Sequence, residues 1–466
     1  MLNFFPRYFS TRAIFCYLAT LVLVSAIYMN HAMPLQFMLF GFVAVLLFFL
    51  YATRLTMKWR TCSPQQFVKK VFITSFIIRL VSVIFIYYYY IAMTGEPHMY
   101  HPGDELYYHW QAITWHDHGF ETFLEVNKDT EYSDMGYMGL LAFEYLLFGT
   151  SVLPSRIIKC VISALSCVLM YHLAKRNFGE SEGRMTAVFC VLMPNMWYYC
   201  GLTLKETEMA FLVILFTERA DATLKAAKIT FKGLLFPALV LIVMFMFRTA
   251  LAAVLVAAFM AALIFSSKKQ LKTGAKIIYS LVFGIWMLLT VGAEMIEETQ
   301  VMWSSQQELQ QVGYMSRAEQ EGGNSFAQYA TASIFAPLIF TIPLSTMVDI
   351  PNQENQMMMN GANFIKNVMS GLTILALFAL LFNKEWRKHV LPLAVMSGYL
   401  VVLVFSNFAH SERFHFPIIA FEYMFAAYGV TRLTNRHKRL YVIWLVVVCV
   451  ANIVWALIKL RGRGMA

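Results

Sequence analysis

The segment His101-Pro-Gly-Asp-Glu-Leu-Tyr-Tyr-His-Trp110 lies in a polar stretch between two strongly apolar parts of the chain. From Thr94 to Met135 this stretch carries nine carboxylates, which are opposed by one lysine, Lys128. Five histidines and several aromatic residues accompany them. The preceding residues, 67–93, are apolar and long enough to cross a bilayer, which takes about 20 helical residues. We therefore predict that the polar stretch follows a membrane span and lies at one membrane face.

The composition indicates a helical protein that crosses the membrane many times. Of 466 residues, 59% are hydrophobic and 14% are charged, whereas soluble proteins carry about 25% charged residues. The net charge of +10 comes largely from short loops between apolar runs, where basic residues orient the spans. It therefore does not indicate a nucleic-acid partner. The seven cysteines lie outside the long acidic loops, so no disulfide framework is expected.

About thirteen spans account for the apolar runs, and the basic loops orient them. The loop before residues 67–93 is strongly basic and hence cytoplasmic, so the polar stretch is predicted to face outward. The apolar segment 136–148 is too short to cross a bilayer and is expected to lie along the outer interface. In this topology Arg461 and Arg463 lie outside, against the positive-inside rule. The spans are predicted at approximately residues 13–30, 34–52, 67–93, 154–174, 185–201, 204–217, 233–247, 249–265, 277–293, 366–382, 390–408, 416–430 and 440–459.

The order of spans and loops predicts four parts of the chain. They are an N-terminal helical hairpin with its basic loop (1–66), a core that includes the first outer loop 94–153 (67–293), a second outer region (294–365) and the C-terminal spans (366–466).

Two further features of the spans and loops lead to predictions. The second outer region contains a semi-apolar piece, Ala332 to Leu344, that is interrupted by Pro337 and Pro343. We expect it to form a small outer subregion with a helix touching the membrane. Arg79 lies inside the span at 67–93, where a charge must reach the interface or find a partner.

Three cations at the outer face point to the chemistry. Lys205, Arg248 and Arg413 stand at span ends or in turns, on the side where orientation signals do not belong. Such cations suit the phosphate of a lipid-linked substrate, which they stabilise through charge-assisted hydrogen bonds. The adjacent Asp104 and Glu105 are the candidate catalytic carboxylates, because a carboxylate near the phosphate can act as general base. Four residues close to these in sequence are assigned supporting roles: Tyr108, His109, Glu206 and His410.

Simpler interpretations of these residues stay open. The paired carboxylates could be solvated loop charges, and the cations could contact lipid headgroups or nearby acidic side chains. His101, Asp104, Glu105 and His109 are of metal-binding types, but their spacing matches no strong zinc signature. We assign no metal ligands, and a divalent cation is left open as a cofactor.

In these features the sequence resembles the GT-C superfamily of membrane glycosyltransferases, which includes protein mannosyltransferases and aminoarabinose transferases. The resemblance is carried by the order and sidedness of several weak motifs: Gly103–Ala112, Gly136–Gly149 with Ser155-Arg156 after it, Leu173–Gly179, Leu204–Thr207 and Glu412–Pro417. The chain departs from the superfamily pattern in three ways. Two extra spans precede the acidic loop, the second acidic position reads Lys-Glu, and no large soluble C-terminal domain is visible.

The resemblance implies a role for each candidate residue. Asp104 would be the catalytic base, and Glu105 would support it or bind a cation. Lys205, Arg248 and Arg413 would bind the donor phosphate, and the long outer loop would cover the acceptor.

The leading hypothesis is transfer of a sugar from a polyprenyl-phosphate-linked donor to an acceptor at the outer face, with inversion. The acceptor could be a lipid, a protein or a glycan, and the protein is expected among the lipids of a bacterial inner (plasma) membrane, with its site on the periplasmic or extracellular face. One alternative is a polymerase or ligase that acts on lipid-linked glycans. Another is a flippase or transporter of lipid-linked sugars, which would favour charges buried in mid-span and inverted repeats.

Overall fold

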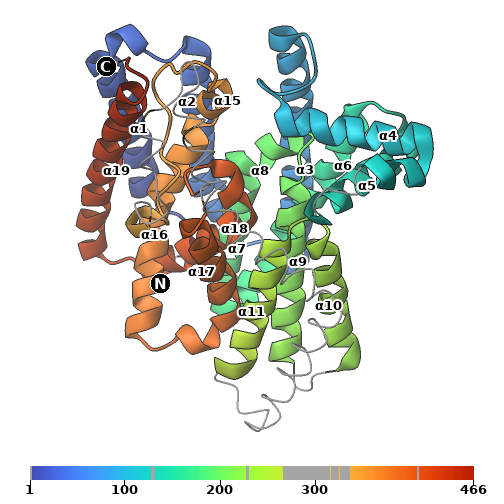
Figure 1. Cartoon of the computed structure of the whole chain (residues 1–466). Helices are drawn as coiled ribbons and strands as arrows, with labels where there is room; N and C mark the ends of the chain where they lie inside the picture. The colour runs from blue at the N-terminus through green and yellow to red at the C-terminus, as the bar shows by residue number, and fades with distance from the viewer. Residues whose placement is uncertain are drawn as a thin grey trace.

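The computed structural model describes residues 3–126, 132–226, 230–265, 315, 325, 336–406 and 409–465. These residues are almost entirely helical, which confirms the predicted all-α fold. Most of the helices run between the two ends of a bundle, and two helices project sideways from one end (Figure 1). Both of the candidate acidic residues of the polar stretch lie on one of these projecting helices.

The bundle begins with three long apolar helices, α1 (Arg7–Ile27), α2 (Leu35–Trp59) and α3 (Pro64–Thr94). The start of α3 is fixed by a capping box, in which Ser63 and Gln66 satisfy each other's backbone amides. Proline at the first helical position suits this site, because its missing N–H would have no helical partner.

The N-terminal hairpin packs against helices from the far end of the chain. Helix α2 contacts α16 (Asn360–Phe382), and α1 contacts α19 (Asn435–Arg461). Tyr17 donates a 2.6 Å hydrogen bond to the side-chain oxygen of Asn360. A Cβ at Gly41 would clash with the same asparagine, so glycine is needed for this close approach.

Two helices form the projecting arm at the end where α3 finishes. Helix α4 (Gly103–Val126) bends at Gly119, whose φ of 84° is left-handed. Helix α5 (Tyr132–Phe148) contacts α4 and ends at Gly149, also left-handed at φ 79°. The last two turns of α5 expose an apolar surface: Phe143, Leu146, Leu147 and Phe148. This surface fits a helix that lies along the membrane interface, as the length of the segment predicted.

The next helices return along the bundle and then reverse. Helix α6 (Val152–Phe178) is followed by α7 (Glu180–Leu192). The predicted span 185–201 is not continuous, because Pro194 lacks an amide hydrogen and starts a new short helix, α8 (Pro194–Tyr198). After the 3-10 turn η2 and an irregular stretch, α9 (Glu206–Lys225) runs back.

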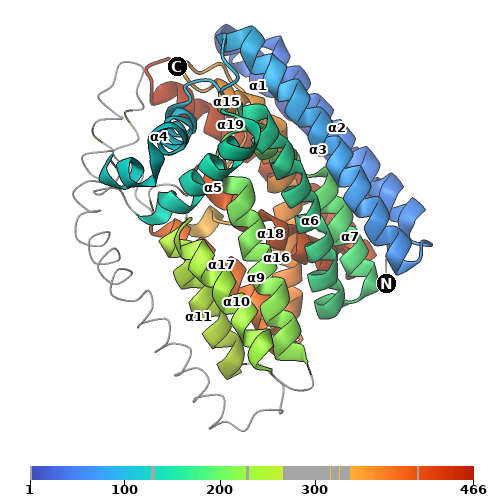
Figure 2. The same cartoon turned by 90° about the vertical axis from the view of Figure 1, so that its right-hand side faces the viewer.

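The remaining helices alternate in direction. Helices α10 (Phe231–Phe245) and α11 (Thr249–Phe265) form an antiparallel pair. They lie beside α9 (Figure 2). After α16 come α17 (Val390–Val404), α18 (Glu412–Thr431) and α19.

Six of the described helices are long and apolar enough to span a membrane, and three shorter ones are apolar. The exact number of thirteen spans stays a prediction, as does the four-part division of the chain. The predicted span 277–293 and most of the second outer region lie outside the described residues. The last turn of α19 is at the same end as the projecting arm (Figure 1). The basic residues Arg461 and Arg463 therefore remain an exception to the charge rule.

The described end of the second outer region differs from its prediction. We expected a membrane-touching helix up to Leu344, but beyond the 3-10 turn η5 (Ala336–Leu338) the backbone is irregular and buried. Side chains of α16 donate hydrogen bonds to its carbonyls. Lys366 donates to those of Phe340 and Ile342, and Asn367 donates to those of Thr341 and Pro343. Non-helical backbone is tolerated at membrane depth when protein groups satisfy it in this way.

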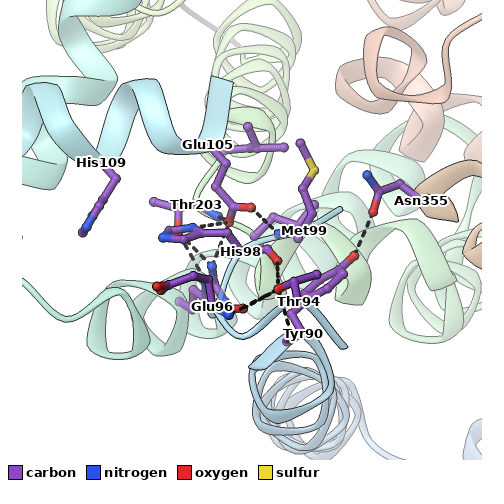
Figure 3. A network of polar contacts seen from close by, with 12 residues as sticks. Tyr90, Thr94, Glu96, His98, Met99, Glu105, His109, Thr203 and Asn355 are labelled. Carbon is purple, nitrogen blue, oxygen red and sulfur yellow. Dashed lines mark hydrogen bonds and ion pairs between the residues drawn. The ribbon is translucent and has the colours of Figure 1, made fainter. Parts of the chain in front are cut away.

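The same outer segment continues into α15 (Glu354–Met358), which contacts the first outer loop. The Asn355 side chain donates to the carbonyl of Tyr100 at 2.6 Å. It also accepts from the Tyr90 hydroxyl at 3.2 Å (Figure 3). The two outer regions are thus joined beside the start of α4.

Arg79 does not reach the interface, because its side chain is fully buried in the bundle. Its guanidinium donates to Ser163 Oγ at 2.7 Å and to the carbonyls of Cys190 at 3.1 Å and Val191 at 3.4 Å. These carbonyls lie at the end of α7, where the break before Pro194 leaves them without helical partners. Arg79 therefore stabilises the broken helix through hydrogen bonds.

Candidate functional site

The N-termini of three helices lie close together, so that charged residues far apart in sequence contact one another. Asp104 is in the first turn of α4, Glu206 in the first turn of α9 and Arg413 in the first turn of α18. The Arg413 guanidinium donates from Nε to Glu206 and from Nη1 to Asp104. Glu206 is fully buried, whereas the Asp104 side chain is 56% exposed. The two acids therefore hold one arginine between the bundle interior and the open surface.

A second cation lies beside this group. Lys205 donates to Asp134 at the start of α5 and to the carbonyl of Phe247 at 3.0 Å. The hydroxyl of Tyr108 also donates to Asp134, at 3.3 Å, and the Lys205 ammonium lies 5.9 Å from the Tyr108 ring centre. Burial lowers the pKa of Lys205, and the Asp134 carboxylate acts against this shift. Lys205 and the supporting residue Tyr108 thus share one acidic partner.

The third predicted cation, Arg248, comes from the turn between α10 and α11. Its guanidinium carbon lies 4.4 Å from the ring centre of Phe414, the neighbour of Arg413. Arg248 is half-buried, and within the described ranges it makes no ion pair. Of the three predicted cations it is thus the one whose charge is not matched by a described carboxylate.

The structure separates Glu105 from this group, although it is adjacent to Asp104. The Glu105 side chain is 0% exposed and accepts from Arg156 at 2.7 Å, Thr203 N at 2.6 Å and Met99 N at 2.9 Å (Figure 3). Burial would raise the pKa of Glu105, but Arg156 and these hydrogen bonds outweigh it and lower the pKa to about 2. These contacts are those of a buried ion pair, and the catalytic role of Glu105 stays a prediction.

The two histidines assigned supporting roles have different surroundings. His109 Nδ1 lies 2.6 Å from the Tyr145 hydroxyl, and its ring centre is 5.3 Å from that of His98. It belongs to the surroundings of Glu105 (Figure 3). Burial and then the neighbouring His98 lower the pKa of His109 to about 4. His410 is half-buried in the turn that leads into α18.

Three functional or supporting residues were not assigned from the sequence. Asp134 was counted among the carboxylates of the polar stretch but given no role. Arg156 and Lys159 lie inside a predicted span, and the rule that singled out Arg79 as an intramembrane charge would have found them too. Both are fully buried on α6 and reach the residues around the site.

The described residues contain no group of three or more histidine, cysteine, aspartate or glutamate side chains that could hold a metal ion. Within the described part of the chain, Asp104 and Glu206 are each bonded to Arg413. The geometry of these residues thus provides cations for an anionic substrate and one exposed carboxylate.

Comparisons with known proteins agree with this chemistry. The family model of dolichyl-phosphate-mannose-protein mannosyltransferases matches residues 137–292, and that of the Alg9-like mannosyltransferases matches residues 357–461. No curated protein sequence matches the chain.

Among solved structures, the apo oligosaccharyltransferase of Archaeoglobus fulgidus is similar, with 11% identity and a TM-score of 0.43. The oligosaccharyltransferase AglB of that organism, in complex with an inhibitory peptide and a dolichol-phosphate, has 11% identity and a TM-score of 0.41. Each comparison covers 85% of this chain and 56% of the other. The chain thus spans little more than half the length of these proteins.

Both family models describe mannosyltransferases, and they match separate segments of the chain. In these two segments the chain is similar to mannosyltransferases, which confirms the resemblance to the GT-C superfamily that its acidic outer loop and helical core predicted.

Proposed function

We propose that this protein transfers a sugar from a polyprenyl-phosphate-linked donor to an acceptor at the outer membrane face. The observation that supports it most directly is the meeting of Asp104, Glu206 and Arg413 at the ends of three helices. Lys205 and Arg248 lie beside them and add positive charge where a phosphate would bind. The match to two mannosyltransferase families makes mannose the first sugar to test.

The proposed reaction is a direct displacement with inversion. Asp104 accepts the proton of an acceptor hydroxyl as the oxygen forms a bond to the anomeric carbon of the sugar. The bond from that carbon to the phosphate oxygen breaks, and its electron pair leaves with the polyprenyl phosphate. Arg413, Lys205 and Arg248 stabilise the negative charge that develops on the leaving group.

This reaction requires Arg413 to exchange partners. In the structure it bonds Asp104 and Glu206, so the carboxylate proposed as base is already engaged. An incoming phosphate would compete with Asp104 for the guanidinium, while the buried Glu206 keeps Arg413 in place. Binding of the donor would in this way free the Asp104 oxygen for the acceptor.

The charges of the site favour a donor with a single phosphate. Among the described residues Arg413 pairs with Asp104 and Glu206, Lys205 pairs with Asp134, and Arg248 has no ion pair. A phosphodiester can therefore bond Arg248 without displacing a carboxylate from it. Three carboxylates against three cations leave no excess positive charge, so a pyrophosphate-linked donor, as a glycan ligase would use, is harder to balance than a phosphodiester.

The acceptor and the location are parts of the same proposal. The first matching family is named for transfer to protein, which supports a protein hydroxyl among the possible lipid, protein and glycan acceptors. The basic loops lie at the opposite end of the bundle from Asp104, which by the positive-inside rule supports an outer-face site. A bacterial plasma membrane, with the site on the periplasmic or extracellular side, is the proposed setting.

The test uses the full chain in lipid vesicles with three radiolabelled donors: polyprenyl-phosphate mannose, polyprenyl-phosphate glucose and a polyprenyl-pyrophosphate-linked sugar. Transfer to membrane proteins, lipids and soluble glycans is measured separately. Wild type is expected to transfer only one of the sugars offered. The transfer rate of Asp104→Asn should fall about 10²–10⁴-fold, and that of the control Glu121→Gln should match wild type. Glu121 is an exposed carboxylate further along α4. Equal transfer by Asp104→Asn and the control would remove Asp104 from the mechanism, and wild-type transfer from pyrophosphate donors alone would overturn the donor class.

A further inference from the structure

Two buried cations on one face of α6 contact the irregular stretch that leads into α9. Arg156 and Lys159 are three residues apart, so their side chains point the same way. Arg156 donates to Thr203 Oγ1 at 3.1 Å as well as to Glu105. Lys159 contacts the residues on either side of Thr203. The two cations thus hold the stretch that carries Lys205 and Glu206.

The ammonium of Lys159 donates three hydrogen bonds. It donates to the carbonyl of Leu202 at 3.0 Å, to the carbonyl of Leu204 and to the hydroxyl of Tyr137 at 2.9 Å. Glu208 Oε2 lies 3.5 Å away and balances its charge. Lys159 is 1% exposed, so no part of it is open to a substrate.

The two leucine carbonyls depend on this contact because they belong to non-helical backbone. Residues 202–204 lie between the η2 turn and the first residue of α9, where helical hydrogen bonds are not formed. A buried carbonyl without a partner costs free energy, so such groups are nearly always bonded. In this stretch Lys159 provides the partner, directly before Lys205 and Glu206.

We propose that Lys159 is a positioning residue, which fixes the backbone of residues 202–204 and thereby aims Lys205 and Glu206 at Asp134 and Arg413. The residues involved are adjacent along the chain: Lys159 donates to the carbonyl of Leu204, Lys205 is the next residue, and Glu206 begins α9. The backbone part of this proposal stands on the geometry alone. The part that concerns substrate binding rests on the proposed function.

Stability alone does not account for a buried lysine at this position. Replacing a buried ion pair by apolar residues of similar volume is often neutral or stabilising, whereas removing one partner is strongly destabilising. Lys159→Met alone would leave the Glu208 carboxylate buried without its cation. The double variant Lys159→Met with Glu208→Gln removes both charges, so it separates loss of positioning from loss of folding.

The experiment compares wild type, Lys159→Met, the double variant and Lys159→Arg in nanodiscs. Lys175→Met is the matched control, since Lys175 lies on the same helix but is 41% exposed. Hydrogen exchange of the amides of residues 203–208 is expected to be about tenfold faster in Lys159→Met and in the double variant. Lys159→Arg should restore part of the protection, and the control should match wild type.

A second readout is binding of dolichyl phosphate, measured on the same samples. We expect the double variant to bind this probe about tenfold more weakly than wild type. Unchanged exchange at 203–208 in the folded double variant would overturn the positioning role. Faster exchange together with no binding of the probe even by wild type would instead count against the proposed function, and would leave the backbone role of Lys159 supported.

Discussion

The neighbouring carboxylates Asp104 and Glu105 are expected to respond in opposite ways to the same chemical change. Glu105→Gln keeps the size of the side chain but removes the charge that pairs with Arg156, and both partners are 0% exposed. Removing one partner of a buried ion pair costs about 3–5 kcal/mol. The depression of the Glu105 pKa from 4.5 to about 2 corresponds to roughly 3 kcal/mol, because proton binding and folding are thermodynamically linked. The two routes agree, so we expect a loss of about 3 kcal/mol in the free energy of unfolding.

Asp104→Asn is expected to leave that free energy nearly unchanged. Its side chain is 56% exposed, and an exposed ion pair contributes only about 0.2–1 kcal/mol. The same change is expected to abolish most sugar transfer, because an amide cannot accept the acceptor proton. We thus expect Glu105 to affect mainly stability and Asp104 to affect mainly activity.

The assay is unfolding of purified variants by SDS titration in mixed micelles, followed by tryptophan fluorescence, with transfer measured on the same preparations. Because the folded-state pKa of Glu105 is lowered, its contribution is complete above about pH 4.5 and is lost as the pH falls toward 2. Glu105→Gln should lack this pH dependence. Equal stability of Glu105→Gln and wild type, or a larger loss in Asp104→Asn, would refute the assignment of the two acids.

Two further predictions concern other buried groups. Burial lowers the pKa of His109 to about 4, so between about pH 4 and 6.5 the unfolded protein binds a proton at His109 that the folded protein does not. The free energy of unfolding should therefore rise with pH across that window. His109→Gln should flatten this rise in the same SDS titration. Arg79→Met should lower the free energy of unfolding by about 1–3 kcal/mol, because the Cys190 carbonyl loses its donor. This loss should be smaller than that of Glu105→Gln, since no described carboxylate is left unpaired; an equal or larger loss would contradict the contacts given for Arg79.

The charges that meet at the site were recognisable in the sequence because they broke a rule. Lys205, Arg248 and Arg413 are cations predicted to lie on the side of the membrane where orientation signals are not needed. The prediction that they approach the acidic loop depended only on sidedness, and the ion pair of Arg413 with Asp104 is consistent with it. Asp134 escaped notice because nothing distinguishes it in sequence from the other carboxylates of its loop.

The choice between Asp104 and Glu105 was beyond the sequence for a geometric reason. Successive residues of a helix point about 100° apart, so neighbours face different partners. Asp104 points toward α18 and its Arg413, while Glu105 points toward α6 and its Arg156. Both cations are remote in sequence, so no local pattern reveals which acid is open and which is enclosed.

The sequence by itself determined that the chain is a helical membrane protein, where most of its helices lie and which loops share a face, because hydropathy and charge act locally along the chain. The tertiary structure decided which of those polar groups touch. The bonding of the Cys190 carbonyl by Arg79, the packing of α6 against the irregular stretch before α9 and the pairing of each acid depend on contacts between distant segments. Such contacts arise only when the helices pack, since burial forces each polar group to find a partner within reach.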